Sequence, residues 1–174
     1  MRKLFIAFFP TILGIGAIAA FHSSPQARNQ LTGWLRSAGF EVGQPEPTHQ
    51  SGCRIKRSRA DNNCTNGYLV SLFDQRTACV SYDASGLTDP SKVQWDKSLR
   101  AYGIRGKKAR HFLPAWLYPE PLGGADRWNN LFPLTRKAWR KWNRDATRVI
   151  DKACQGQLSL AKAREVLKKR WSRV

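Results

Sequence analysis

The middle of the chain carries the stretch that decides the expected fold. Residues 110–135 read RHFLPAWLYPEPLGGADRWNNLFPLT. They contain His111, the only histidine beyond position 50, then a glycine pair at 123–124 and an asparagine pair at 129–130. The residues themselves indicate a turn at the glycine pair and place the asparagine pair just ahead of an expected helix.

A basic amphipathic helix is expected next, over Thr135 to Cys154, with Gly156 placed to end it. Its apolar residues recur at steps of three and four and form one face. They are Trp139, Trp142, Ala146, Val149, Ile150 and Ala153. The two tryptophans could stack on unpaired bases, but their place on the apolar face favours a core role.

The opposite side of this helix carries a cationic stripe. Its members recur at the same helical steps and are Lys137, Lys141, Arg144, Arg148 and Lys152. Only Asp145 and Asp151 supply carboxylates within the helix. The cations therefore have few partners of their own, which favours contact with phosphate over a merely solvated face.

Two further helices are expected. One begins after Ser159 as its N-cap and buries a face made of Leu160, Ala163, Leu167 and Trp171. The other covers Asp89 to Tyr102, ends at Gly103, and has one face made of Val93, Leu99 and Tyr102. Residues 51–82 alternate apolar patches, such as Cys79-Val80, with polar turns, which predicts small strands or loops.

The composition indicates one folded and strongly cationic domain. The chain has 174 residues, a formal charge of +18 and 41% hydrophobic residues. Such a chain can bury a core, which excludes a long disordered basic tail. A field this positive favours a polyanionic partner, either nucleic acid or an anionic membrane or envelope polymer.

The N-terminus is typical of exported proteins. Arg2 and Lys3 precede an uncharged apolar run from Leu4 to Phe21, which is either an export signal or a single membrane anchor. Residues 22–50 are expected to form a linker and residues 51–174 the basic domain. The protein is thus expected to be periplasmic, extracellular or tethered to the membrane.

Four cysteines follow the apolar run, and their even number predicts two disulfides formed in an oxidising compartment. They are Cys53, Cys64, Cys79 and Cys154. A zinc site is the rival interpretation, but the spacings match no paired C-x-x-C ribbon. Three pairings are possible, and we favour Cys53 with Cys64 and Cys79 with Cys154.

A series of short motifs occurs in order between residues 95 and 171. They are Tyr102-Gly103, His111 with Pro114, Leu122-Gly123-Gly124, Asn130-Leu131-Phe132-Pro133, Cys154-Gln155-Gly156, Leu160 with Ala163, and Trp171. In this order the chain resembles a family of small HNH endonuclease-like proteins. The resemblance implies an α+β fold with a small ββα core and flanking helices. In that core a histidine at the end of a short strand is followed by a hairpin loop and by an asparagine that leads into a helix. It also implies that His111 is the general base and that Asn130 holds the catalytic loop and orients the imidazole.

The resemblance also implies a divalent metal (Mg, Mn, Ni or Zn), yet the expected ligand positions differ here. The acidic residue directly before the histidine is replaced by Arg110, and the closing helix offers Ala146 and Ile150. Arg110 could supply a permanent positive charge to phosphate in place of the metal. The alternative is that other carboxylates reach the site, the candidates being Glu120, Asp126 and Asp145.

Three functions follow from these observations. The first is an exported or membrane-tethered nuclease that cuts DNA or RNA with little sequence specificity, with His111, Asn130 and Arg110 in the site. The second is an inactive relative that binds nucleic acid through the cationic stripe. The third is a cationic structural protein of the envelope. Without catalysis, His111 is an ordinary strand residue and Asn130 a turn or cap residue.

Overall fold

The helices and strands of the protein are known for residues 46–173 from a computed structural model. The expected export segment at 1–21 and nearly all of the expected linker at 22–50 lie outside these described residues. Within residues 46–173, none of the helices combines the length and the hydropathy that a membrane span requires.

A two-stranded antiparallel sheet lies at the centre of the fold. Strand β1 (Phe112–Trp116) pairs with β2 (Leu131–Thr135), from Phe112 opposite Thr135 to Trp116 opposite Leu131. The connection contains two short 3-10 helices, η2 (Glu120–Leu122) and η3 (Trp128–Asn130). Strand β2 is buried along its first four residues, so the pair forms part of the core rather than a surface hairpin.

Helix α5 (Arg136–Cys154) continues directly from β2 and packs against both strands. The indole Nε1 atoms of Trp139 and Trp142 donate to the carbonyl oxygens of Pro114 and Trp116, at 2.7 and 3.1 Å. These bonds join the apolar face of the helix to the backbone of β1. Both tryptophans therefore pack against the sheet, as their helical spacing predicts.

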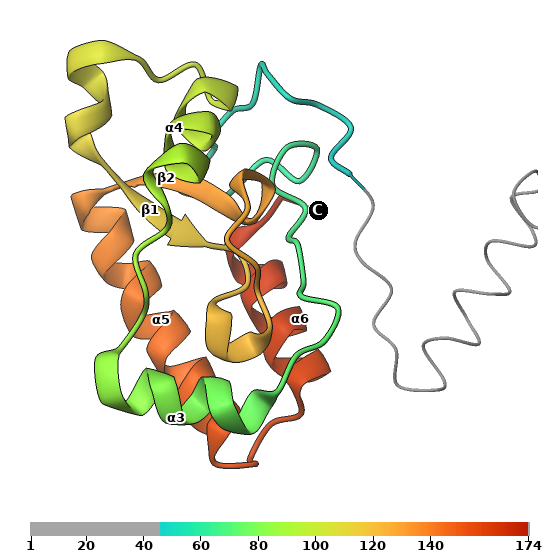
Figure 1. The fold of residues 1–174 in the computed structure, drawn as a ribbon. Coiled ribbons are helices and arrows are strands. Elements are labelled where there is room, and N and C mark those ends of the chain that lie inside the picture. Colours follow the sequence, from blue (N-terminus) through green and yellow to red (C-terminus); the bar gives the residue numbers. More distant parts are fainter. Residues whose placement is uncertain (1–45, 174) are drawn as a thin grey trace, which may run out of the picture. The chain divides into compact units, whose positions relative to one another are not determined.

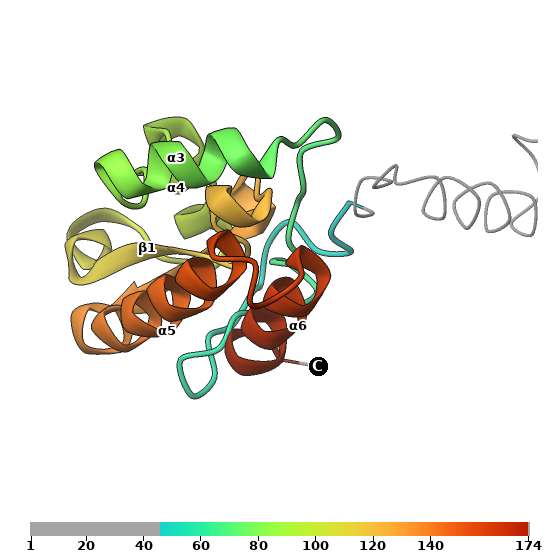
Figure 2. The ribbon, with the colours of Figure 1, turned by 90° about the horizontal axis from the view of Figure 1, so that it is seen from below.

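Helices cover both sides of the sheet. In Figure 2, β1 lies between α3 (Gln75–Ser85) and α4 (Lys92–Ala101) on one side and α5 and α6 (Leu160–Trp171) on the other. The 3-10 helix η1 (Gly106–His111) leads into β1 at the upper left of Figure 1. The fold is α+β, as the sequence predicts.

The two disulfides have the favoured pairing. Cys53 is bonded to Cys64, and Cys79 on α3 is bonded to Cys154 at the end of α5. The first bond closes a short loop, whereas the second joins residues 75 positions apart. Disulfides of this kind are typical of proteins that fold in an oxidising, exported environment.

The ends of the last two helices are confirmed in detail. Thr135 is the N-cap of α5, and Gly156 beyond its end has a φ of 73°, where a side chain would be strained. The hydroxyl of Ser159 caps α6 by accepting a hydrogen bond from the backbone N–H of Lys162.

Two expectations for the earlier part of the chain are wrong. The apolar pair Cys79-Val80 lies in helix α3, not in a strand or loop, because Asp74 caps the helix by accepting from the N–H of Arg76. The helix expected from Asp89 begins only at Lys92, since Pro90 disfavours a helical backbone at the residue before it. Val93 lies in the first turn of that helix and is 70% exposed, not packed.

Candidate nucleic-acid interface

His111 lies at the corner where the sheet meets the start of α5. It is the last residue of η1 and is exposed, and the next residue, Phe112, pairs with the α5 N-cap Thr135. The expectation that the histidine ends a short strand is therefore wrong: residues 106–111 form a 3-10 turn, and the strand begins only after His111. The first turn of a helix presents unpaired backbone N–H groups and the positive end of the helix dipole. The imidazole thus stands at a solvent-accessible position whose surroundings favour an anion.

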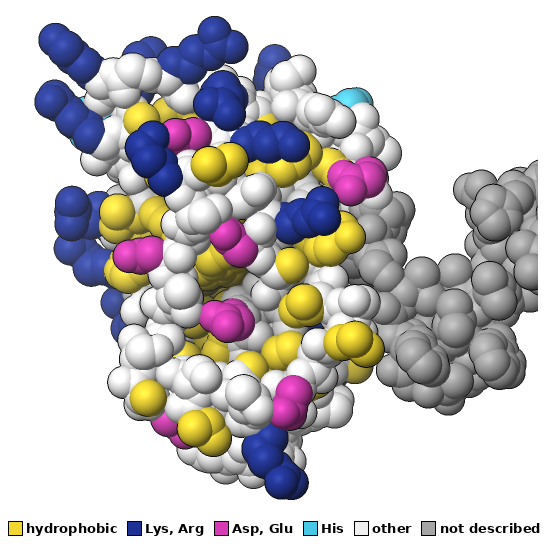
Figure 3. All heavy atoms as spheres, viewed as in Figure 1, with side chains coloured by type: hydrophobic (Ala, Val, Ile, Leu, Met, Phe, Trp, Pro, Cys, Tyr) yellow, Lys and Arg dark blue, Asp and Glu magenta, His cyan; other side chains and the backbone are white. Residues whose placement is uncertain are grey.

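Five exposed cations surround this position, and we call them the basic corner. They are Lys107, Lys108 and Arg110 of η1 and Arg136 and Lys137 of α5. None of the five forms a salt bridge with a carboxylate of the described residues. Figure 3 shows Lys and Arg side chains gathered at the upper left, where η1 lies in Figure 1, and along the left edge beside α5. Their mutual repulsion favours a polyanion.

Asn130 lies inside the connection between the strands and is fully buried. It leads into β2 and not, as expected, directly into a helix, because Leu131 is extended and pairs with Trp116 of β1. Its Oδ1 accepts from the N–H of Tyr118 at 2.9 Å, and its Nδ2 donates to the carbonyl oxygens of Tyr118 and Ala125 at 2.8 and 3.0 Å. Both amide protons are therefore used within the loop. The structure places Asn130 as the residue that holds the loop, and no hydrogen bond among the described residues joins it to His111.

The glycine pair has a clear steric role in the same loop. Gly123 has a φ of 82°, which side chains rarely adopt. A Cβ on Gly124 would lie 1.6 Å from the carbonyl oxygen of Tyr118 and 2.8 Å from Nδ2 of Asn130. Only glycine permits this close approach, so the motifs Gly123-Gly124 and Asn130 build one compact loop.

The cationic stripe of α5 lies on the surface, as expected. Lys137, Lys141, Arg144 and Arg148 are all exposed. Asp145 does not neutralise them, because it is 8% exposed and its Oδ2 pairs with Nε of Arg170 on α6 at 2.9 Å. The stripe therefore continues the basic corner along α5.

The side chains around His111 do not fit a divalent metal. The residue before it is the cation Arg110, and the α5 positions expected to hold a ligand, Ala146 and Ile150, are apolar and fully buried. Within residues 46–173, no three His, Cys, Asp or Glu side chains are grouped so that they could share a metal ion. Hard divalent cations require oxygen donors, which this corner does not offer.

The three alternative carboxylates are engaged elsewhere in the fold. Glu120 accepts from the hydroxyl of Thr88 at 2.8 Å. Asp126 accepts from the N–H of Ser91 at the start of α4. Asp145 pairs with Arg170, as described above. The structure thus does not bring these three carboxylates together with His111.

One cationic surface was not predicted from the sequence. Residues 56–59 form a tight hairpin that lies against α5 and the end of α6 and lines a pocket with them. The signal was the cationic run from Arg54 to Arg59, which interrupts a segment expected to consist of small strands or loops.

The functional assignment depends on this geometry, since comparison with known proteins adds nothing to it. No protein-family model, no curated protein and no solved structure matches the chain.

Proposed function

We propose that the protein is an exported HNH-like nuclease that binds DNA or RNA on its basic surface and hydrolyses phosphodiester bonds. The observation that carries the proposal is the position of His111. It is an exposed potential base directly before a strand–loop–strand–helix unit, beside the five cations of the basic corner. This arrangement supplies a base and positive charge, which are two requirements of phosphodiester hydrolysis.

In this mechanism His111 is the general base. A ring nitrogen of the neutral imidazole takes a proton from a water molecule as the water oxygen forms a bond to phosphorus. The bond from phosphorus to the leaving sugar oxygen breaks, and that oxygen takes a proton from solvent. Arg110 binds the non-bridging oxygens, on which negative charge develops, through the fork of its guanidinium. Asn130 acts as a positioning residue, because it fixes the loop between the strands.

A second candidate is a protein of the same architecture that binds nucleic acid without cutting it. The replaced ligand positions favour it, because a cation at Arg110 opposes a divalent metal where the family resemblance implies one. The cationic stripe would then carry the whole function.

The test measures cutting and binding on the same full-length protein. Plasmid DNA and a structured RNA are incubated with EDTA or with Mg, Mn, Ni or Zn, using the wild type, His111→Ala and His49→Ala. His49 is an exposed histidine outside the basic corner and serves as the matched control. The nuclease proposal requires cutting that His111→Ala abolishes and His49→Ala retains. Binding with no cutting under any condition supports the second candidate instead.

A charge reversal tests the replaced ligand position. We expect Arg110→Asp to bind a divalent metal in titration calorimetry more tightly than the wild type, since it restores a carboxylate beside His111. If the wild type already binds the metal and cuts only with it, the metal-free mechanism is wrong.

A further inference from the structure

A second cationic site lies away from the histidine. An open pocket of about 610 Å³ is lined by the hairpin 56–59, by Ala138 and Lys141 of α5, and by the end of α6. Its lining includes no carboxylate, and its charged members are Lys56, Arg57, Arg59, Lys141, Arg170 and Arg173. Its volume lies in the range of pockets that hold small ligands, so it can accept a group of nucleotide size.

The hairpin of this pocket has an unusual backbone. Arg57 and Ser58 have φ angles of 52° and 61°, and the N–H of Arg59 donates to the carbonyl of Lys56 at 3.0 Å. A two-residue turn with both φ angles positive is normally made by Asn-Gly. Here it contains an arginine at a position where a side chain is strained. Such strain is often retained at sites that serve binding.

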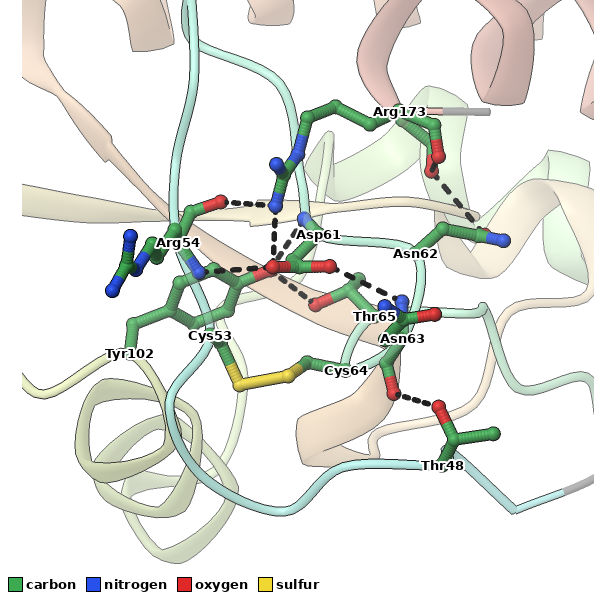
Figure 4. A network of polar contacts seen from close by, with 11 residues as sticks. Thr48, Cys53, Arg54, Asp61, Asn62, Asn63, Cys64, Thr65, Tyr102 and Arg173 are labelled. Atoms are coloured by element: carbon green, nitrogen blue, oxygen red, sulfur yellow. Dashed lines mark hydrogen bonds and ion pairs between the residues drawn. A yellow bond between two sulfur atoms is a disulfide. The ribbon is translucent and has the colours of Figure 1, made fainter.

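A polar network holds the base of the hairpin in place (Figure 4). Asp61 Oδ2 accepts from the N–H of Arg54 at 3.1 Å and forms an ion pair with Arg173, which also donates to the carbonyl of Arg54. The disulfide Cys53–Cys64 closes the same loop. Just beyond the hairpin, Ala60 pairs with the backbone at the end of α6. The hairpin cations are thus attached to a braced loop, which lowers the entropy lost on binding.

The charges in the pocket are only partly balanced. Arg170 pairs with Asp145 and Arg173 with Asp61. The other four cations, Lys56, Arg57, Arg59 and Lys141, form no salt bridge with a carboxylate of the described residues. In addition, Trp171 lines the pocket, and its buried Nε1 has no hydrogen-bond partner in the described part of the chain. An anion in the pocket would relieve the repulsion among these cations.

We propose that this pocket binds a phosphate group of a nucleic-acid strand, at a position separate from His111. The assignment to a strand depends on Lys141, which belongs both to the pocket and to the cationic stripe of α5. Lys141 follows the α5 N-cap by six residues, about 9 Å along the helix axis. A strand that lies on the stripe therefore passes the pocket and the basic corner together. The inference rests on the proposed nucleic-acid function and adds a second anchoring point to it.

The turn offers a variant that separates charge from folding. The double variant Arg57→Asn/Ser58→Gly creates the favoured Asn-Gly turn. It removes one cation of the pocket and also relieves the backbone strain, so we expect a higher Tm. Ser58→Gly alone relieves the backbone and keeps the charge. Lys141→Gln removes a second pocket cation, and Arg76→Gln on α3 is the control that loses one charge outside the pocket.

The experiment measures binding of fluorescein-labelled single-stranded DNA and RNA oligonucleotides to the full-length protein in EDTA, as a function of salt. We expect Arg57→Asn/Ser58→Gly and Lys141→Gln each to weaken binding about tenfold and to make the log–log salt slope shallower by about one. Ser58→Gly should bind like the wild type and Arg76→Gln nearly so. A higher Tm of Arg57→Asn/Ser58→Gly together with its weaker oligonucleotide binding excludes misfolding as the cause of the lost affinity.

Other results overturn the inference in distinguishable ways. If the wild type binds and cuts nucleic acid but the pocket variants match Arg76→Gln, the pocket proposal fails and the proposed function stands. If the wild type binds no oligonucleotide, both fail. Saturation of the pocket by inorganic phosphate without strand binding would assign it to a free anion. A further outcome is that the pocket variants bind oligonucleotides as tightly as the wild type does, and that all of them bind phosphatidylglycerol vesicles equally well. This would assign the contact to general attraction of polyanions.

Discussion

Two buried polar side chains, Asn130 and Tyr102, fix the loops around the sheet. Asn130 makes three hydrogen bonds to the backbone of the connection between β1 and β2. The Tyr102 hydroxyl accepts from the N–H of Asp61 at 3.0 Å and shares a hydrogen bond with Thr65 at 2.8 Å. At the residue scale, the loops beside the sheet are therefore specified by polar groups whose loss leaves buried partners unpaired.

We expect Asn130→Ala to lower the free energy of unfolding by about 3 kcal/mol, because the N–H of Tyr118 and two carbonyl oxygens lose their partner. Urea unfolding of the full-length protein measures this loss. Asn129→Ala is the control, because Asn129 is equally buried but its Oδ1 has no hydrogen-bond partner in the described chain and its Nδ2 makes one long bond, to Oδ1 of Asn66 at 3.4 Å. Equal losses at the two positions would show that the Asn130 amide does not hold the loop.

Burial raises the pKa of the Tyr102 hydroxyl to about 12, although the hydrogen bonds from Thr65 and from the backbone of Asp61 lower it. The unfolded chain loses this proton near its ordinary pKa of 10.0, and the folded chain only near 12. Between these values the unfolded state binds fewer protons than the folded state. The contribution of Tyr102 to the free energy of unfolding is therefore fully present well below pH 10 and is lost as the pH rises toward 12.

The expected loss is about 2 kcal/mol between about pH 9 and about pH 11.5, measured by urea unfolding. The Tyr102→Phe variant lacks this hydroxyl and should lose correspondingly less over the same interval, because the other titrating groups are common to both proteins. An identical pH dependence of the two proteins would contradict the assignment.

At the scale of elements, α5 organises the fold and α3 depends on it. The apolar face of α5 contacts β1 and β2, whereas α3 has only one buried residue, Cys79. That residue is disulfide-bonded to Cys154, and Gln75 of α3 donates to the carbonyl of Ala153 at 3.1 Å. Helix α3 is thus attached to α5 through a covalent bond, through the Gln75 hydrogen bond and through the Tyr82 hydroxyl, which contacts Thr147 and Asp151.

Replacing both Cys79 and Cys154 by serine should lower stability by about 4 kcal/mol, since this bond closes a loop of 75 residues in the unfolded chain. Replacing both Cys53 and Cys64 should cost about 3 kcal/mol, because that loop is shorter, with a separation of 11. Guanidinium unfolding measures both values. Hydrogen exchange should also show that the amides of α3 lose protection in the first variant. Unchanged protection of α3 would mean that its noncovalent contacts suffice.

At the scale of the whole molecule, the charge of +18 is not spread evenly. The basic corner and the cationic stripe form one continuous surface along η1 and α5, and the hairpin pocket adjoins it at Lys141. A surface of this kind attracts a polyanion at long range and releases counterions when it binds, so its affinity depends on salt.

Replacing Lys137, Lys141, Arg144 and Arg148 together by glutamine should make the log–log salt slope of nucleic-acid binding shallower by about four. The matched control replaces four exposed cations of other helices, Arg76, Lys92, Lys162 and Lys169, and leaves the same net charge. Salt titrations of the two variants should therefore differ. The same slope in both variants would indicate attraction by net charge alone. That result would favour the third function, a cationic structural protein of the envelope.

Elements whose signals are local could be predicted from the sequence. The face of α5, its end near Gly156 and the cap of α6 at Ser159 all depend on residues within one or two turns. The α+β class and the two disulfides were also predictable. Helix α3 has an N-cap residue in Asp74, but its apolar pair Cys79-Val80 is also typical of a short strand, so the local sequence is ambiguous.

Contacts between segments that are distant in the sequence follow from the packing of the whole fold. Asn130 satisfies backbone groups 5 and 12 residues away, Asp145 turns from the stripe toward Arg170, and Lys141 meets a hairpin more than 80 residues earlier in the chain. Such contacts form because buried polar groups must find partners wherever the packed helices bring them, and no local periodicity specifies those partners.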